Sequence, residues 1–282
     1  MSLTPRPPLR DVIARHRLDA RRKLGQHFLL DGNLTARIVR AAGPLAGRHV
    51  VEVGPGPGGL TRSLLDSDAA TVTVIEIDPR AVRAIGELAN DSGGRLHVVE
   101  GDALAIDVPG LVPAPRQVIA NLPYNVATPL LIGWLRQAGA FEQLVLMFQQ
   151  EVAERICATP GTAAYGRLSV LAQWLADVWI ELRIPPAAFV PPPLVWSAVV
   201  RLVAHARQPA PRLFAAMERV TAAAFGQRRK MLRSALRPLG GERMLSAAGI
   251  AGDRRAETLG IAEYDRLARV AVEASESSCF RP

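Results

Sequence analysis

A chain of 282 residues that is 49% hydrophobic and 21% charged has the composition of a globular protein, with enough length for one large core and a smaller second domain. No apolar run is long enough to cross a bilayer, and the basic N-terminus lacks the apolar segment of a secretory signal, so we expect neither a membrane protein nor a secreted one. Two cysteines, Cys157 and Cys279, are too few for a disulfide framework or a metal cluster, so we expect free thiols, no metal and a reducing cytoplasm.

The net charge of +8 is concentrated at the two ends of the chain. Residues 1–30 carry +5 (seven basic, two acidic), residues 31–203 carry −3 (13 basic, 16 acidic) and residues 204–282 carry +6 (14 basic, eight acidic). This distribution is expected if a catalytic body is held on a polyanion by its ends. Merely solvated basic tails are the alternative, and charge alone does not separate the two.

The first half of the chain alternates between helical and strand patterns. Residues 1–20 read as a loose basic leader with a short helical turn in "DVIARHRL". Helical spacing follows in "DGNLTARIVRAAGPL", with Asp31 or Asn33 as the N-cap, then a strand in "HVVEV" and a helix starting near Gly59. "TVTVIEID" predicts a strand, "PRAVRAIGELAN" a helix with Pro79 in its first turn, and "RLHVVEGDAL" and "QVIANLPY" two further strands.

The second half continues this alternation and then changes. "PLLIGWLRQAG" predicts a helix, "FEQLVLMFQQEVAERI" a strand running into a helix, "RLSVLAQWLADVWIELRI" a helix running towards a strand, and "SAVVRLV" a late strand. Alternation at this spacing predicts a doubly wound, mostly parallel α/β sheet of the Rossmann-like type. After "HARQPAPR" the pattern is helical only, including "KMLRSALRPL". We therefore predict a Rossmann-like domain over 1–205, with the leader at 1–20, and a small helical domain over 206–282.

The turn "EVGPGPGG" follows a strand and opens a helix, as a nucleotide-binding turn does. Gly54, Gly56 and Gly59 fit the spacing G-x-G-x-x-G. However, Pro55 and Pro57 each remove an N–H group that a dinucleotide pyrophosphate would need. A ligand that needs close approach to the backbone but carries no phosphate fits better, and S-adenosyl-L-methionine is such a ligand.

Acidic residues end the next two strands. Glu76 is placed to accept hydrogen bonds from both ribose hydroxyls of the cofactor. Asp78 is the competing acid, two residues on and on the same face of an extended strand. Asp102, in "EGDAL", could accept a hydrogen bond from the amino group of the cofactor's adenine. Because open α/β sheets bind ligands at the carboxyl ends of their strands, the glycine turn and these acids together predict one cofactor site.

The fourth strand ends in "NLPY", residues 121–124. The exocyclic amine of adenine is a poor nucleophile because its lone pair is delocalised into the ring. The side-chain oxygen of Asn121 and the carbonyl of Leu122, held in place by Pro123, can accept the amine's hydrogens and direct that lone pair. The ring of Tyr124 can stack on a base that has left its helix or loop. These four residues predict methyl transfer by in-line displacement, without a general base.

These motifs belong to a longer series of sequence blocks. "KLGQHFLLD", "VEVGPGPGGLT", "VIEID", "GDAL", "NLPYNVATP", "QQEVAERI", "YGRLSVLAQ", "AFVPPPLVWSAVVRL" and "FGQRRKMLRSAL" follow, in order, the blocks of the ribosomal RNA adenine dimethyltransferases, which the chain resembles from about residue 20 to its C-terminus. It is most similar to the bacterial small-subunit branch, which dimethylates two adjacent adenines in the 3′-terminal hairpin loop of 16S rRNA. The branch that methylates 23S rRNA fits "GQHFL" and "GQRRKMLRSAL" less well.

The resemblance implies roles for individual residues. It favours Glu76 over Asp78, and it implies that Phe189 of "AFVPPP" packs on the other face of the target base. Leu194 stands where family members usually have a basic residue, so one RNA contact is expected to be missing. Many relatives have Asn in place of His27. The cofactor contacts implied are His27, Leu29, Gly54, Glu76, Asp102 and Asn121, to which the glycine turn adds Gly56.

A basic cluster lies in "FGQRRKMLRSALRPL". Arg229, Arg233 and Arg237 recur at i, i+4 and i+8, which places them along one face of the predicted helix, with Arg228 and Lys230 beside it. We predict that this cluster contacts RNA phosphates, chiefly through Arg228, Arg229, Lys230 and Arg233. A solvated helix is the alternative.

The sequence thus predicts a cytoplasmic, monomeric dimethyltransferase that uses S-adenosyl-L-methionine. Its expected partner is 16S rRNA within the small ribosomal subunit or its precursor, and its reaction is expected to be linked to maturation of that subunit. One alternative is an adenine methyltransferase acting on 23S rRNA or on DNA. Another, of a different class, is a ribosome assembly factor that acts mainly by binding.

Overall fold

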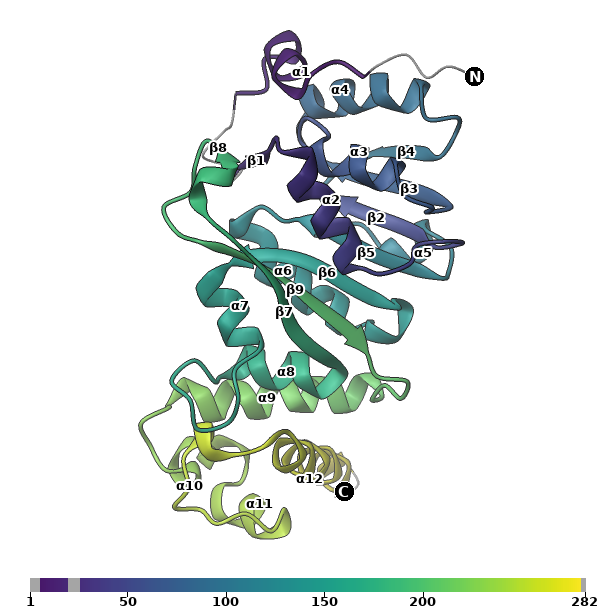
Figure 1. Cartoon of the computed structure of the whole chain (residues 1–282). Coiled ribbons are helices and arrows are strands. Elements are labelled where there is room, and N and C mark those ends of the chain that lie inside the picture. Colours follow the sequence, from purple (N-terminus) through teal and green to yellow (C-terminus); the bar gives the residue numbers. More distant parts are fainter. Residues whose placement is uncertain (1–5, 20–25, 280–282) are drawn as a thin grey trace. The chain divides into compact units, whose positions relative to one another are not determined.

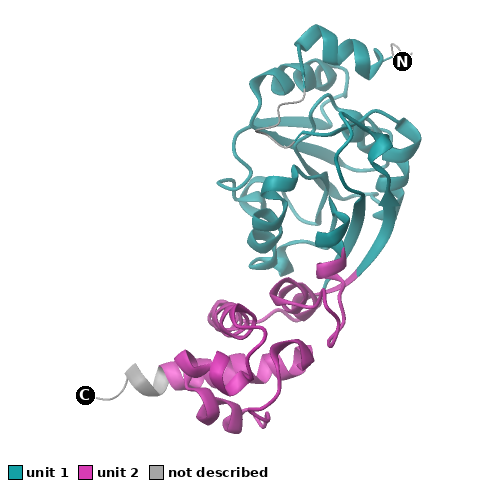
Figure 2. Ribbon diagram, turned by 90° about the vertical axis from the view of Figure 1, so that its left-hand side faces the viewer, with its two compact units in different colours: residues 1–153, 179–204 teal, residues 154–178, 205–282 magenta. Residues whose placement is uncertain are grey.

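The computed structural model describes residues 6–19 and 26–279, and for residues 276–279 the backbone only. Part of the predicted leader, the start of "KLGQHFLLD" and the side chain of Cys279 therefore lie outside the described residues. The chain forms two compact units, one of residues 1–153 and 179–204 and the other of residues 154–178 and 205–282 (Figure 2). The predicted boundary placed 154–178 in the first domain, whereas in the structure this segment packs with the C-terminal helices.

The first unit is built on a seven-stranded sheet in the order β4-β3-β2-β5-β6-β9-β7 (Figure 1). The strands from β4 to β6 pair in parallel, and β9 is antiparallel to β6. The strands are β2 (His49–Val53), β3 (Thr71–Glu76), β4 (Leu96–Glu100), β5 (Arg116–Asn121), β6 (Gln143–Gln149), β7 (Ala176–Ile184) and β9 (Ser197–Ala204). The prediction of a doubly wound, mostly parallel sheet is confirmed.

The helices of this unit begin where the sequence has the corresponding caps. Asp31 is the N-cap of α2 and accepts a hydrogen bond from the backbone N–H of Asn33 at 2.8 Å, and Asp78 caps α4 ahead of Pro79. The helices are α1 (Leu9–His16), α2 (Gly32–Ala41), α3 (Gly59–Leu65), α4 (Pro79–Asn90), α5 (Val108–Leu111), α6 (Tyr124–Leu135) and α7 (Gln150–Ile156), the last of which runs into the second unit.

The central strands are buried along almost their whole length. In β2 and β3 every residue after the first is buried, which is typical of parallel strands covered on both faces. The apolar side chains of these strands form one core with α2, α3 and α4. Polar side chains stand at the carboxyl ends, Glu76 on β3 and Asn121 on β5. The fold therefore gathers polar groups at one edge of the sheet, where open α/β sheets bind ligands.

The described part of the leader is docked on this unit rather than loose. Val12 of α1 and Leu18 pack against Ala81 and Ala84 of α4, and all four side chains are buried. Arg6 forms an ion pair with Asp66 at 2.8 Å. The arginines of the leader thus serve at least in part to hold it on the protein.

The second unit is helical, as predicted for the C-terminal region. Its core contains the stacked rings of Phe225 and Tyr264, with centroids 5.7 Å apart, and the buried Tyr165, whose hydroxyl donates to the carbonyl of Leu259 at 2.9 Å. Its helices are α8 (Arg167–Leu175), α9 (Pro211–Gly226), α10 (Leu232–Ala235), α11 (Gly241–Ala247) and α12 (Ile261–Cys279). Among the helices of the described residues, none combines the length and apolar character that a membrane crossing needs.

The predicted single helix over "KMLRSALRPL" is wrong. The chain turns after α9, α10 has only four residues, and Arg237–Leu239 form a 3₁₀ turn. The backbone bonds instead to a distant segment, because Met231 pairs with Arg255 and the N–H of Leu232 donates to the carbonyl of Arg254 at 2.8 Å. Pro238 also lacks the N–H that a longer helix would use. Arg229, Arg233 and Arg237 therefore do not share one helical face.

Candidate active site

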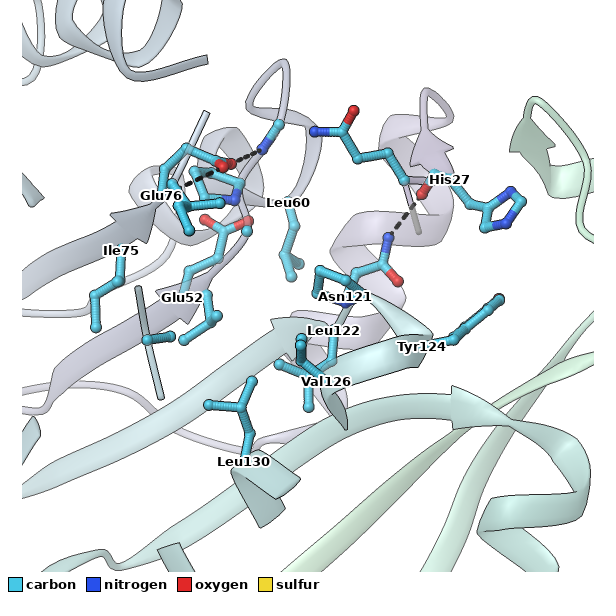
Figure 3. Close-up of a pocket in the computed structure, with 18 of the residues that line it drawn as sticks. His27, Glu52, Leu60, Ile75, Glu76, Asn121, Leu122, Tyr124, Val126 and Leu130 are labelled. Carbon is cyan, nitrogen blue, oxygen red and sulfur yellow. Dashed lines mark hydrogen bonds between the residues drawn. The ribbon is translucent and has the colours of Figure 1, made fainter. Parts of the chain in front are cut away.

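A pocket of about 250 Å³ opens at the carboxyl ends of the parallel strands (Figure 3). It brings together ten residues that the sequence singled out, from five separate segments of the chain. They are His27, Leu29, Gly54, Gly56, Glu76, Asp102, Asn121, Leu122, Pro123 and Tyr124. The described side chains of Phe189, Arg228, Arg229, Lys230 and Arg233 are not among those that line it.

The glycine turn contributes conformation and space rather than free N–H groups. Gly54, Gly56 and Gly58 all have positive φ, at 71°, 53° and 90°. A Cβ on Gly56 would lie 2.8 Å from the ring of Phe28. The N–H groups of the three glycines already donate to Ile75, Glu76 and Pro55. A pyrophosphate would find none of these three free, in keeping with a ligand that has no phosphate.

The carboxylate of Glu76 is held by the backbone around it. One oxygen accepts from the N–H groups of Ile77 and Asp78 at 2.9 and 2.8 Å, and the other from that of Gly56 at 3.3 Å. Burial raises the pKa of Glu76, and these three hydrogen bonds oppose that rise. The second oxygen accepts one bond from the protein, which leaves a lone pair for a ligand hydroxyl.

Asp78, the competing acid, has a different task. Its side chain is buried, accepts from the backbone N–H of Arg80 at 3.0 Å and forms an ion pair with the Arg80 guanidinium at 2.7 Å. It therefore fixes the start of α4 and is not among the described residues lining the pocket. Of the two acids, the geometry offers Glu76 to a ligand.

Apolar pocket residues next to the two strand-end acids were missed by sequence reasoning. Ile77 follows Glu76, Leu104 follows Asp102 by two positions, and both side chains are more than half exposed. Asp102 itself is exposed and accepts from the N–H of Leu104 at 2.9 Å. Exposed apolar side chains beside a carboxylate suit a flat heterocycle with an amino group at its edge. The available signal was an apolar residue shortly after each strand-end acid.

Glu52 is an acid of the pocket that sequence reasoning missed. It lies on β2, lines the pocket and is 1% exposed. Thr61 donates a hydrogen bond to its carboxyl group at 2.7 Å. Burial raises the pKa of Glu52 to about 8, and the nearby Glu76 carboxylate adds to the rise. A glutamate inside the apolar strand "VVEV" was the available signal.

Replacing Glu52 with glutamine should change how stability depends on pH. The unfolded chain releases this proton near pH 4.5 and the folded chain near pH 8, so between these values the folded state holds the extra proton. The free energy of unfolding of the wild type should then fall as pH rises through this window, by up to about 1.4 kcal/mol per pH unit. The glutamine of E52Q has no proton to release in this range. The free energy of unfolding of E52Q, relative to that of the wild type, should therefore rise from pH 5 to pH 8.

Urea unfolding at pH 5 to 9 measures this difference. Glu100→Gln is the matched control, because Glu100 is an exposed glutamate at the end of β4. The E52Q curve should diverge from that of the wild type, and the E100Q curve should stay parallel to it. Parallel curves for all three proteins would contradict the assignment.

Asn121 is oriented by the backbone of a distant segment. Its side-chain nitrogen donates to the carbonyl oxygen of His27 at 3.0 Å. The amide oxygen therefore faces the opposite way, towards the side of the pocket where Tyr124 lies (Figure 3). A fixed amide oxygen at this place can accept a hydrogen from an amine that enters beside Tyr124.

Tyr124, the first residue of α6, is held at both ends. Its hydroxyl bonds to that of Ser197 at 2.6 Å, and its ring stacks on the His27 imidazole with centroids 5.4 Å apart. Burial raises the pKa of Tyr124, so the hydroxyl stays protonated at neutral pH. The His27 ring also bonds to the carbonyl of Pro191 at 2.8 Å. The tyrosine is thus fixed as a flat surface rather than as a base.

The structure corrects the expectation for Phe189. This residue forms the short strand β8 (Phe189–Val190), which pairs with β1 (Phe28–Leu29). Its side chain is 2% exposed and belongs to the core of the first unit, and its ring makes a T-shaped contact with the His27 ring. Both faces are covered by protein, so in this conformation a target base has no access to it.

The predicted RNA contacts lie in the second unit. Arg229 and Lys230 are exposed in the turn after α9, and Arg233 is exposed on α10. Arg228 is half-buried and donates to the carbonyl of Thr162 at 3.1 Å. The three exposed cations therefore remain clustered on the short segment 229–233, although no continuous helix carries them.

Across the described residues, no group of three or more His, Cys, Asp or Glu side chains is arranged to hold a metal ion.

The sequence matches a family model described as ribosomal RNA adenine dimethylase over residues 17–273. It is 64% identical over 264 residues to the ribosomal RNA small subunit methyltransferase A of Gluconobacter oxydans, covering 94% of this chain and 87% of that protein. The protein of the same name from Rhodospirillum rubrum is 57% identical over 272 residues, covering 96% and 94%.

The chain is also similar in structure to solved methyltransferases. A dimethyladenosine transferase from Plasmodium falciparum superimposes with a TM-score of 0.72 at 25% identity, over 86% of this chain and 96% of that one. The 23S rRNA methyltransferase ErmE superimposes with a TM-score of 0.64 at 27% identity, over 86% and 98%. The likeness thus extends beyond the sheet to most of each molecule.

Proposed function

The chain belongs to the family of ribosomal RNA adenine dimethylases, which are S-adenosyl-L-methionine-dependent methyltransferases, and we propose that its substrate is 16S rRNA of the small ribosomal subunit. The reaction is the transfer of two methyl groups to the exocyclic amine of each of two adjacent adenines in the 3′-terminal hairpin loop. The observation that supports this most directly is the amide of Asn121, fixed beside Tyr124 at the edge of a pocket suited to the cofactor.

Different pocket residues would contact different parts of the cofactor. Glu76 would accept from the ribose, Asp102 would accept from the adenine amine, and Ile77 and Leu104 would cover the faces of the ring. Because Gly56 has no side chain, the ring of Phe28, which also lines the pocket, can pack directly against the glycine turn. When bound, the cofactor supplies an electrophilic methyl group on a positively charged sulfur.

The chain's own residues prepare the acceptor nitrogen. The side-chain oxygen of Asn121 and the carbonyl of Leu122 accept the two N–H hydrogens of the adenine amine, which draws the nitrogen towards tetrahedral geometry and exposes its lone pair. The Tyr124 ring stacks on the base and fixes its orientation. The bound cofactor would supply the methyl group to this nitrogen, and the surplus proton would then leave the nitrogen for water.

The basic segment 228–233 would hold the RNA through its phosphates. Replacing Arg229 and Lys230 with alanine should weaken binding to undermethylated small subunits and reduce the salt dependence of that binding. The slope of log K against log salt should fall by about 1 for each phosphate that the variant no longer neutralises. Arg243→Ala, an exposed arginine on α11, is the control and should keep the wild-type slope. An unchanged slope in the double variant would contradict the assignment.

Methyl labelling tests the proposed reaction. Undermethylated small subunits incubated with this chain and methyl-labelled S-adenosylmethionine should gain four methyl groups each, mapping to two adjacent adenines. Large subunits and duplex DNA, supplied in competition, should remain unlabelled. Preferential labelling of either competitor would favour the alternative substrates.

The assembly-factor alternative needs a separate test, because binding and methylation can coexist in one protein. Cells that contain only an Asn121→Ala chain should accumulate immature small subunits if methylation is needed for maturation. Normal maturation in those cells would make binding the essential act. We further infer a cytoplasmic protein that acts as a monomer without a metal, which sedimentation and elemental analysis of the purified chain would check.

A further inference from the structure

A short surface segment carries an unusual amount of exposed apolar area. Nine large apolar side chains are exposed in the described part of the chain, and four of them lie within residues 190–196. Leu194 is 101% exposed and Trp196 is 49% exposed, with Val190 and Val195 near them in sequence. Scattered apolar residues are common on protein surfaces, but a contiguous exposed group marks an interaction site. We call residues 194–196 the apolar tip.

Both ends of this segment are attached to the wall of the active-site pocket. The carbonyl of Pro191 bonds to the ring of His27 at 2.8 Å, and the hydroxyl of Ser197 bonds to that of Tyr124 at 2.6 Å. His27 and Tyr124 stack on each other and both line the pocket. The apolar tip therefore lies between two anchor points at the place where a base would enter.

The chemistry of the segment suits a nucleobase rather than a phosphate. Between Arg183 and Arg201 the chain has no charged residue, so this segment supplies no charged partner for an RNA phosphate. An indole ring and a leucine side chain can instead cover the flat face of an unpaired base. The prolines at 191–193 restrict the backbone before the tip, which lowers the entropy cost of ordering the tip when it binds.

We propose that Leu194 and Trp196 bind the nucleobase next to the adenine that occupies the pocket. This proposal rests on the proposed function, in which the two target adenines are adjacent. While one adenine lies beside Asn121 and Tyr124, its neighbour lies on the apolar tip. The tip thereby holds the RNA strand open and is a substrate-binding element distinct from the basic segment 228–233.

Equilibrium binding of undermethylated small subunits tests the proposal. Trp196→Ala should weaken binding by about 5- to 150-fold, the range that corresponds to stacking on one base. Leu194→Ala should weaken it less, and Trp196→Phe should restore most of the affinity. Trp179→Ala is the matched control, because Trp179 is 37% exposed in the same unit but packs against Arg201. It should bind as the wild type does, and cofactor affinity should be unchanged in all variants.

Two readouts identify the ligand of the tip. The salt dependence of binding should be the same in W196A as in the wild type, since the tip neutralises no phosphate. Replacing the neighbouring adenine by uridine in the RNA should weaken wild-type binding, and combining this change with W196A should add little. Two outcomes would overturn the proposal. One is wild-type binding by W196A. The other is full additivity of the two changes, which is the result expected if the tip binds a ribosomal protein instead. Absence of methyl transfer by the wild-type chain would instead overturn the proposed function.

Discussion

Replacing Asn121 with alanine should lower kcat for methyl transfer by about 10²- to 10³-fold, the usual effect of removing an oriented hydrogen-bonding group at a reacting centre. The amide oxygen is fixed in the pocket because the amide nitrogen donates to the carbonyl of His27. Without it, the adenine amine keeps its delocalised lone pair and lacks a fixed orientation. Cofactor affinity should fall by less than about tenfold, since the variant gives up at most one neutral hydrogen bond to the cofactor.

Asn125→Ala is the matched control for this experiment. Asn125 is also an asparagine that lines the pocket, but it is exposed on α6 and follows the "NLPY" segment. Single-turnover kinetics with saturating subunits and cofactor should show a large decrease for N121A and near wild-type rates for N125A. Equal decreases in the two variants would mean that Asn121 has no special part in the chemistry.

Glu76 and Asp78 should respond to alanine substitution in opposite ways, although they are two residues apart. E76A should raise the Kd for S-adenosylmethionine by at least about 100-fold, because it removes charge-assisted hydrogen bonds to the ribose. D78A should leave that Kd within about threefold. It should instead lower the free energy of unfolding by about 0.5–2 kcal/mol, the cost of removing an N-cap, since Asp78 holds the start of α4.

Calorimetric titration of the cofactor and urea unfolding, carried out on both variants, separate the two effects. Glu76→Gln should give an intermediate Kd, because it keeps one oxygen but removes the charge. A large rise in the Kd of D78A with unchanged stability would reverse the assignment of the two acids.

The positions of the strands and the site at their ends could be read from the sequence because local signals and the fold agree there. Asp31 and Asp78 cap helices as their side chains favour, and the β-branched run before Glu76 forms a buried strand. The order of glycine turn, strand-end acid and "NLPY" along the chain then brought the predicted pocket residues to one edge of the sheet. That edge follows from parallel pairing alone.

The features that the sequence did not predict depend on contacts between distant segments. The helix expected over "KMLRSALRPL" is broken because Met231 pairs with Arg255, and helical spacing carries no information about that pairing. Phe189 was expected to contact the base, but its pairing with Leu29 places it in the core. Glu52 and Ile77 both line the pocket, but the buried side chain of Glu52 and the exposed side chain of Ile77 depend on how the folded chain packs around them.

The contact that orients Asn121 also bears on how this protein can evolve. The partner of the amide nitrogen is the backbone carbonyl of residue 27, and every amino acid supplies that group. Substitution at position 27 can therefore accumulate as neutral drift as far as the Asn121 amide is concerned, provided that strand β1 keeps its pairing with β8. Position 121 has no such freedom, because there the side chain itself makes the contact.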